Sequence, residues 1–108
     1  MIYYSGKSIV FENKRVILDY LIKKVIEFES IVVVLFYDKE IIPNNIVAFD
    51  TKGNQAWKIN DILQIKNPTG NVDIMKMSKC MLGVYSDLSI EYRIDVNKRE
   101  LINKTYLR

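Results

Sequence analysis

The chain has 108 residues, of which 49% are hydrophobic and 27% charged, as expected for one globular domain spanning residues 1–108. Its formal net charge is only +3, and it contains no histidine and one cysteine, Cys80. These counts exclude a Ser-His-Asp catalytic arrangement, most zinc and iron sites and a disulfide framework. We therefore expect a non-enzymatic protein without cofactor or metal.

The sequence contains no membrane or export signal that we can identify. Residues 1–15 lack the apolar segment of a signal peptide, and the longest apolar run, residues 31–37, is too short to span a bilayer. We therefore expect a cytoplasmic protein with no membrane partner. Abundant Ile, Lys and Asn with few Ala resemble the composition of AT-rich bacterial genomes.

The first third of the chain contains short strands and one ambiguous segment. Residues 2–4 and 8–12 are predicted strands, and the chain as a whole holds 16 Ile and 10 Val, which favour strands. Residues 16–28 fit an amphipathic helix with an apolar stripe, but their many β-branched residues and lack of Ala favour two strands. We prefer the strands, and a helix at 16–28 in an α+β fold is the alternative.

The segment Ile31–Tyr37 is apolar at every position, which is typical of a strand covered on both faces. Residues 38–44 contain Pro43 and Asn44 and are predicted to form a loop. This strand should therefore lie in the middle of a sandwich, barrel or covered sheet.

Residues 45–59 are predicted to form a β-hairpin. Asp50 and Gly53 occupy the positions that they prefer in a type I turn, and Gly53 can adopt the left-handed conformation of a G1 bulge. Pairing Asp50 with Asn54 places Val47 opposite Trp57. Side chains alternate along strands, so the predicted core face holds Val47, Phe49, Trp57 and Ile59.

The second half of the chain is predicted to contain more strands and a second hairpin. Residues 62–66 are assigned a short strand, residues 67–71 form the strongest turn cluster, and residues 73–81 have little pattern. Further strands are expected at 80–85, 88–96 and 100–107, with Asn97 or Lys98 in the left-handed position of the last turn. The apolar face of this hairpin holds Leu88, Ile90, Tyr92, Ile94, Ile102 and Tyr106.

The two hairpins resemble each other at an offset of 45 residues. The alignment pairs Asp50 with Asp95, Phe49 with Ile94, Val47 with Tyr92 and Trp57 with Ile102. An apolar strand precedes each hairpin. We therefore predict an all-β fold of two three-stranded antiparallel meanders that form a small sandwich or barrel.

The first hairpin also carries a local resemblance. Residues 46–50, Gly53 and Trp57 resemble the inner hairpin of quinoprotein-type β-propeller blades, and the stretch is similar to ones in small uncharacterised bacterial proteins. A propeller needs about 4–8 blades, and two units cannot close such a ring. The resemblance therefore implies a hairpin and no propeller function.

Several side chains could carry chemistry, but each has a simpler structural explanation. Asp50 and Asp95 could act as a carboxylate pair, yet both are expected to cap their turns. Cys80 is expected to be a buried, inert thiol. Met75, Met77 and Met81 could form an adaptable surface and are interpreted as core gap-fillers.

These observations predict a non-catalytic binding or protein-interaction domain, of which an immunity or accessory protein is one form. A homodimer is expected if terminal strands need cover. The alternative is a nucleic-acid-binding module that uses the basic and aromatic C-terminal hairpin. The candidate binding residues lie in the loops 38–45 and 66–72 and on the C-terminal hairpin: Lys39, Asn44, Asn67, Asn71, Arg93, Lys98 and Arg99.

Overall fold

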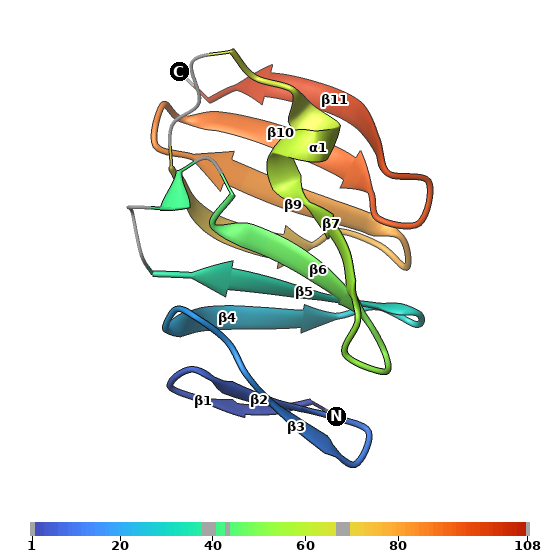
Figure 1. Cartoon of the computed structure of the whole chain (residues 1–108). Coiled ribbons are helices and arrows are strands. Elements are labelled where there is room, and N and C mark those ends of the chain that lie inside the picture. The colour runs from blue at the N-terminus through green and yellow to red at the C-terminus, as the bar shows by residue number, and fades with distance from the viewer. Residues whose placement is uncertain (1, 38–40, 43, 67–69, 108) are drawn as a thin grey trace.

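The computed structural model describes residues 2–37, 41–42, 44–66 and 70–107. In this part of the chain, eleven strands form three antiparallel sheets, accompanied by one short helix (Figure 1). In chain order the elements are β1 Tyr3–Ser5, β2 Ser8–Phe11, β3 Lys14–Ile17, β4 Ile22–Glu27, β5 Ile31–Phe36, β6 Ile46–Asp50, β7 Gln55–Lys58, α1 Ile59–Leu63, β8 Asn71–Lys76, β9 Met81–Ser86, β10 Ile90–Asp95 and β11 Glu100–Tyr106. The all-β prediction is confirmed.

Two of the sheets are meanders of four consecutive strands. Their strand orders are β4-β5-β6-β7 and β11-β10-β9-β8. The prediction of two meanders is confirmed, but each has one strand more than expected, namely β4 and β8. No strand is predicted at residues 73–81, because their sequence has little apolar alternation. In the structure only Ile74 of β8 is buried, which agrees with this weak pattern.

The alternative of a helix at residues 16–28 is wrong. Val16 ends up in β3 opposite Ile9, and Val25 lies in β4 opposite Val34. These cross-strand contacts between β-branched residues are the kind that stabilise a sheet. Composition therefore predicted this segment better than apolar periodicity did.

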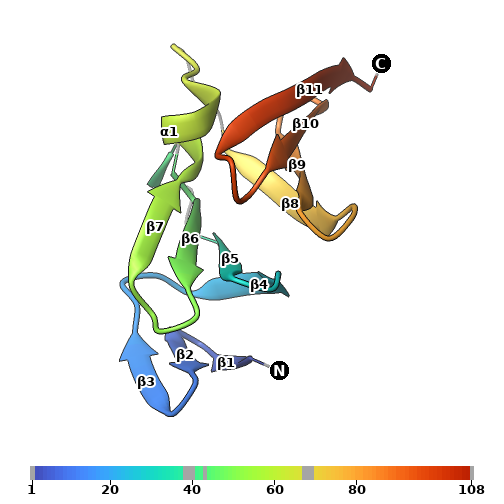
Figure 2. The same cartoon turned by 90° about the vertical axis from the view of Figure 1, so that its right-hand side faces the viewer.

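The main core lies between the two four-stranded sheets. It contains inward-facing residues such as Val33 and Ala48 from one sheet and Val84 and Tyr92 from the other. Helix α1 contacts β6 and β7 as well as β11, and it stands where the two sheets diverge (Figure 2). The core is thus that of an open sandwich, and the barrel alternative is not realised.

The opposite face of the β4–β7 sheet carries a second core. The small β1-β2-β3 sheet packs against it through Ile9 and Phe11, both fully buried (Figure 2). All six residues of β5 are buried in consequence. The prediction that this strand is covered on both faces is confirmed.

Lysine side chains join the edge strands β4 and β8. Lys23 Nζ donates to the carbonyl oxygen of Val72 at 2.7 Å, and Lys24 Nζ donates to that of Ile74 at 2.6 Å. In return Lys76 Nζ donates to the carbonyl oxygen of Glu27 at 3.0 Å. Ammonium groups thus bond to backbone carbonyls of both edge strands and link the two large sheets along β4 and β8.

The β6–β7 turn forms as predicted, but the strand register is wrong by one residue. Gly53 has φ of 93°. Phe49 lies opposite Gln55, whereas Ala48 lies opposite Trp57 and not opposite Ala56. Ala56 is the extra residue of a β-bulge. The side chains of Trp57 and Lys58 therefore point to the faces of the sheet opposite to those predicted.

This bulge decides which side chains face the main core. Trp57 joins the inter-sheet core with Ala48 and is 3% exposed, while Val47 and Phe49 belong to the opposite face. The prediction of a buried Trp57 is confirmed, but the predicted grouping with Val47 and Phe49 is wrong. The bulge also leaves Gln55 and Lys58 on the same face as Val47.

Replacing Gly53 by alanine is expected to lower the free energy of unfolding by about 2–3 kcal/mol. A side chain here must adopt the left-handed conformation, which costs roughly 1–2 kcal/mol, and its Cβ would lie 2.9 Å from Phe11 Cδ2. Gly6 provides a matched control, because its φ of 59° is also positive but nothing lies within 4 Å of an added Cβ. Urea denaturation should show a clearly smaller loss for Gly6→Ala, and equal losses would refute the proposed Phe11 contact.

The side chain of Asp50 caps its turn, as predicted. Its Oδ1 accepts hydrogen bonds from the backbone N–H groups of Asn54 and Lys52, both at 2.9 Å. These bonds, that from Asn54 first, lower the pKa of the Asp50 carboxyl below its usual value.

The low pKa of Asp50 predicts a pH-dependent part of the stability. The ionised carboxylate is favoured in the folded chain, so its contribution is present above the unfolded-state pKa and is lost as the pH falls through the lower folded value. Asp50→Asn should therefore lose less unfolding free energy than the wild type between about pH 5 and about pH 3. Urea titrations across this range test it, and parallel pH profiles would contradict it.

The second hairpin follows the first in general form and differs in detail. Its bulge falls at Ile102, between the pairs Arg93–Asn103 and Ile94–Leu101. Ile102 is 51% exposed, so it does not play the part of Trp57. In the turn between β10 and β11 the left-handed conformation is adopted by Arg99, with φ of 57°. The prediction of Asn97 or Lys98 for this position is therefore wrong.

The predicted apolar face of the second hairpin is correct only in its first strand. Ile90, Tyr92 and Ile94 are buried in the main core. In contrast, Leu88 and Tyr106 are largely exposed, and every residue of β11 is exposed. β11 is an edge strand that pairs only with β10, so its side chains have a neighbouring strand on one side only.

The strand predicted at residues 62–66 is wrong, because the chain forms α1 at residues 59–63. The Asp61 carboxylate accepts the Lys58 N–H at 3.2 Å, and Asn44 Oδ1 accepts the Asn60 N–H at 2.9 Å. Gln64 ends the helix in the left-handed conformation. Polar groups therefore satisfy the helix start, one of them from a distant loop.

Candidate functional site

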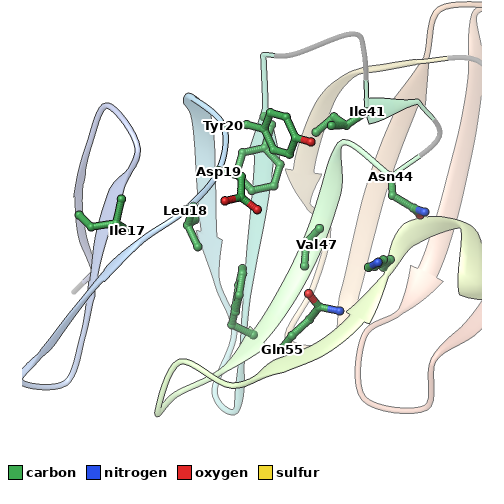
Figure 3. A pocket seen from close by; sticks show the side chains of 11 residues that line it. Ile17, Leu18, Asp19, Tyr20, Ile41, Asn44, Val47 and Gln55 are labelled. Carbon is green, nitrogen blue, oxygen red and sulfur yellow. The ribbon is translucent and has the colours of Figure 1, made fainter.

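A surface hollow of about 400 Å³ lies on the face of the β4–β7 sheet that the β1-β2-β3 sheet covers only in part (Figure 3). Its floor consists of Phe36 from β5 and of Val47 and Phe49 from β6. A volume of about 300–1,000 Å³ is typical of binding sites, and the exposed lining of this hollow is polar and apolar in similar parts. We call this feature the sheet hollow.

Two walls enclose the sheet hollow. One is the segment 17–20, which connects β3 to β4, and the ring of Tyr20 stands edge-on to Phe36 at 5.7 Å. The other is β7, from which Gln55 and Lys58 project toward the floor. Figure 3 shows the Asp19 carboxylate and the Gln55 carboxamide on opposite sides of Val47.

The sheet hollow thus combines an apolar floor with four polar side chains around it. Asp19 provides a negative charge, Lys58 a positive charge, and Asn44 and Gln55 provide carboxamides. Asp19 and Lys58 form no ion pair with any residue in the described ranges. A few convergent polar groups above an apolar floor are what a ligand needs for orientation.

The apolar surface continues beyond the sheet hollow. A second depression of about 290 Å³ shares Asp19 and Tyr20 with it and is bordered by Leu21, Tyr37 and the cationic Lys7. Leu21 and Tyr37 are 52% and 59% exposed, and Ile17, on the other side, is 69% exposed. The apolar area is therefore wider than the sheet hollow alone.

The predicted binding residues fall in two separate places. Asn44 lines the sheet hollow, and its Oδ1 also accepts the Asn60 N–H. Asn71, at the start of β8, donates from Nδ2 to Asn45 Oδ1 at 3.0 Å and so helps to join the two large sheets. Lys39 and Asn67 lie outside the described residues.

Arg93, Lys98 and Arg99 lie on the C-terminal hairpin, away from the sheet hollow. Arg93 Nε donates to Glu91 Oε1 at 2.7 Å, and this bond, followed by one from Tyr85, lowers the pKa of the Glu91 carboxyl. Lys98 and Arg99 are exposed in the β10–β11 turn. Tyr92 of this hairpin is buried in the main core, whereas Tyr106 is 65% exposed with Lys104 Nζ 5.2 Å from its ring centroid. Base stacking on this hairpin stays a prediction.

The other candidate side chains have mostly structural surroundings. Asp95 Oδ1 accepts the N–H groups of Asn97 and Lys98, so Asp95 caps its turn as Asp50 does, and both interpretations as turn caps are confirmed. Cys80 is only partly buried and lies just before β9, which corrects the prediction of a buried strand residue. Met75 is 47% exposed, so its role as a core gap-filler is wrong.

Within the described residues, no three acidic or cysteine side chains come together as a metal site. The helix in this part of the chain is far too short and too polar to cross a bilayer. The sheet hollow was not predicted, because its walls come from segments that are distant along the chain.

The fold and the site define a small all-β domain of stacked antiparallel sheets with an apolar surface hollow. Residues 1–106 match the family described as "Domain of unknown function (DUF7957)", and the chain belongs to this family. No curated protein and no solved structure matches the chain. The resemblance of the β6–β7 hairpin to a propeller blade stays a local sequence resemblance.

Proposed function

We propose that this chain is a non-catalytic protein-interaction domain, and that the sheet hollow receives an apolar side chain of its partner. The observation that carries the proposal is the sheet hollow together with the exposed apolar side chains beside it, Ile17, Leu21 and Tyr37. An apolar pocket that continues into exposed apolar surface and has a polar border is typical of a protein-binding site.

The width of this surface favours a protein over a small metabolite. A ligand that only fills about 400 Å³ leaves Leu21 and Tyr37 exposed, because they border the neighbouring depression. A partner segment that crosses both depressions covers them. Removing such side chains from water contributes roughly 25 cal/mol for each Å² of apolar surface.

The chemistry around the sheet hollow supports a non-catalytic role. The chain has no histidine, and Asp50 and Asp95 hold their own turns through their carboxylates. Asp19 has no second carboxylate beside it among the lining residues. A single carboxylate without a partner acid or base is a weak basis for general acid–base chemistry.

The proposal includes the setting expected from the sequence, a cytoplasmic bacterial protein. One cysteine and no disulfide fit a reducing compartment. An immunity or accessory protein that acts by covering a surface of its partner is one form of this function. A second copy of the chain is another partner to be tested.

Replacing Ile17 by lysine tests the proposal with little risk to the fold, because this side chain is 69% exposed on the wall of the sheet hollow. Peptides of about 12 residues selected on the purified wild-type chain from a random display library are expected to share a large apolar residue. Their affinity should fall at least about tenfold for Ile17→Lys, or 1.4 kcal/mol.

Leu88→Lys is the matched control. Leu88 is similarly exposed at 64% and lies in the turn between β9 and β10, away from the sheet hollow. The substitution makes a similar change in charge and size. Its peptide affinity should equal that of the wild type. Equal losses for both variants, or a library without any shared apolar residue, would contradict the proposed site.

A further inference from the structure

We infer that the segment bound in the sheet hollow is an extended peptide that carries a basic and an acidic residue on opposite sides of its apolar anchor. This inference rests on the proposed function and specifies the chemistry of the partner. It follows from the separation of the charges of Asp19 and Lys58 across the floor.

The two charges stand on different walls. Asp19 precedes Tyr20, whose ring contacts Phe36 of β5, while Lys58 lies in β7 opposite Val47 of β6. The sheet order places β6 between β5 and β7, and neighbouring strands are about 4.8 Å apart. Val47 pairs with Val34 of β5, two residues from Phe36. Phe36, beside the Asp19 wall, and Lys58 are therefore separated by two strand spacings across the sheet and by two residues along it, roughly 12 Å in all.

This spacing sets the pattern of the peptide. An extended chain rises about 3.3 Å per residue, so roughly 12 Å corresponds to about three to four residues. A peptide that runs across the strands can place a Lys or Arg beside Asp19 and an Asp or Glu beside Lys58. Its apolar anchor then falls between them, over Val47.

The carboxamides on the border are suited to a peptide backbone. The Gln55 side chain offers one donor group and one acceptor, as a peptide unit does, and it makes no hydrogen bond with a described residue. Asn44 uses its Oδ1 for the Asn60 N–H, which leaves its Nδ2 group to donate to a peptide carbonyl. A purely apolar ligand would leave these groups without new partners on desolvation, which is unfavourable.

A charge-reversal selection tests the inference. The double variant Asp19→Lys with Lys58→Glu keeps the net charge and changes only lining residues that the main core does not use. Peptides selected from the same display library should carry Lys or Arg and Asp or Glu about three to four positions apart. Read from the N-terminus of the peptide, the order basic residue, apolar anchor, acidic residue should be reversed between peptides selected on the wild-type chain and those selected on the charge-reversed chain. Each peptide should bind its own chain at least about tenfold more tightly than the other.

The matched control reverses two exposed charges of the second unit, Lys79→Glu with Glu100→Lys. It should select the wild-type peptides. If the wild-type and reversed chains select the same apolar peptides irrespective of charge, the inference is wrong and the proposed function stands. If neither chain selects an apolar anchor, the proposed function fails as well. Thermal unfolding followed by circular dichroism checks that all variants are folded.

Discussion

Replacing Trp57 by alanine is expected to lower the free energy of unfolding by about 3–5 kcal/mol, a large part of the stability of a domain of this size. The indole ring is 3% exposed between the two four-stranded sheets. Its Nε1 donates to the carbonyl oxygen of Val96, in the turn after β10, at 3.2 Å. Alanine creates a cavity in the main core and leaves this buried carbonyl without its donor.

Trp57→Phe separates the two effects. It keeps one aromatic ring in the core but loses the N–H donor and part of the indole volume, so an intermediate loss of about 2–3 kcal/mol is expected. Urea denaturation followed by far-ultraviolet circular dichroism measures both variants without relying on the fluorescence of the replaced residue. If Trp57→Ala is no less stable than Trp57→Phe, the ring does not fill the space between the sheets.

Replacing Asn45 by alanine is expected to lower the free energy of unfolding by about 3 kcal/mol, because several buried hydrogen bonds are lost together. Asn45 is 4% exposed and stands just before β6. Its Nδ2 donates to the carbonyl oxygens of Asn71 at 2.8 Å and Phe36 at 3.3 Å. Its Oδ1 accepts from Asn71 Nδ2 and from the Asn71 N–H. One side chain thus ties the end of β5 to the start of β8.

Asn103→Ala is the control for this variant. Asn103 is an exposed residue of β11 whose Nδ2 donates to Thr105 Oγ1 at 3.3 Å. Its loss should change the unfolding free energy by less than about 0.5 kcal/mol. If the two variants were equally stable in urea denaturation, the Asn45–Asn71 contact would not be a link between the sheets.

The sequence was informative where residue type alone determines the structure. The all-apolar segment at residues 31–36 became a strand buried on both faces, and the β-branched residues at 22–27 became β4 despite their helical spacing. Asp50 and Gly53 formed the expected turn. In each case the local preference and the tertiary environment agree.

The sequence was less informative where one residue changes the alternation. The bulge at Ala56 moves Trp57 to the inter-sheet core and leaves Gln55 and Lys58 with Val47. No local residue preference marks Ala56 as the extra residue. A strictly alternating hairpin would have placed Trp57 on the face of the sheet hollow, and Lys58 and Gln55 could not both line it.

The sheet hollow could not be predicted for a related reason. The wall at residues 17–20 comes before β4, and the wall of β7 follows β6, so they meet only in the folded chain. Asn44 was the predicted site residue that lines it, whereas Asp19, Gln55 and Lys58 were missed. A signal was present in the apolar residues Ile17 and Leu21 beside charged neighbours, but the helix alternative offered a competing explanation for that pattern.

The most direct test of the proposed interaction surface is an amide NMR titration of the full chain with a peptide selected on it. We expect chemical-shift changes at Leu18 to Tyr20 and at Val47, Gln55 and Lys58, which line the sheet hollow. The amides of Arg93, Lys98 and Arg99, on the C-terminal hairpin, should stay unchanged. Changes confined to the C-terminal hairpin, with none around Val47, would contradict the assignment of the sheet hollow as the binding site.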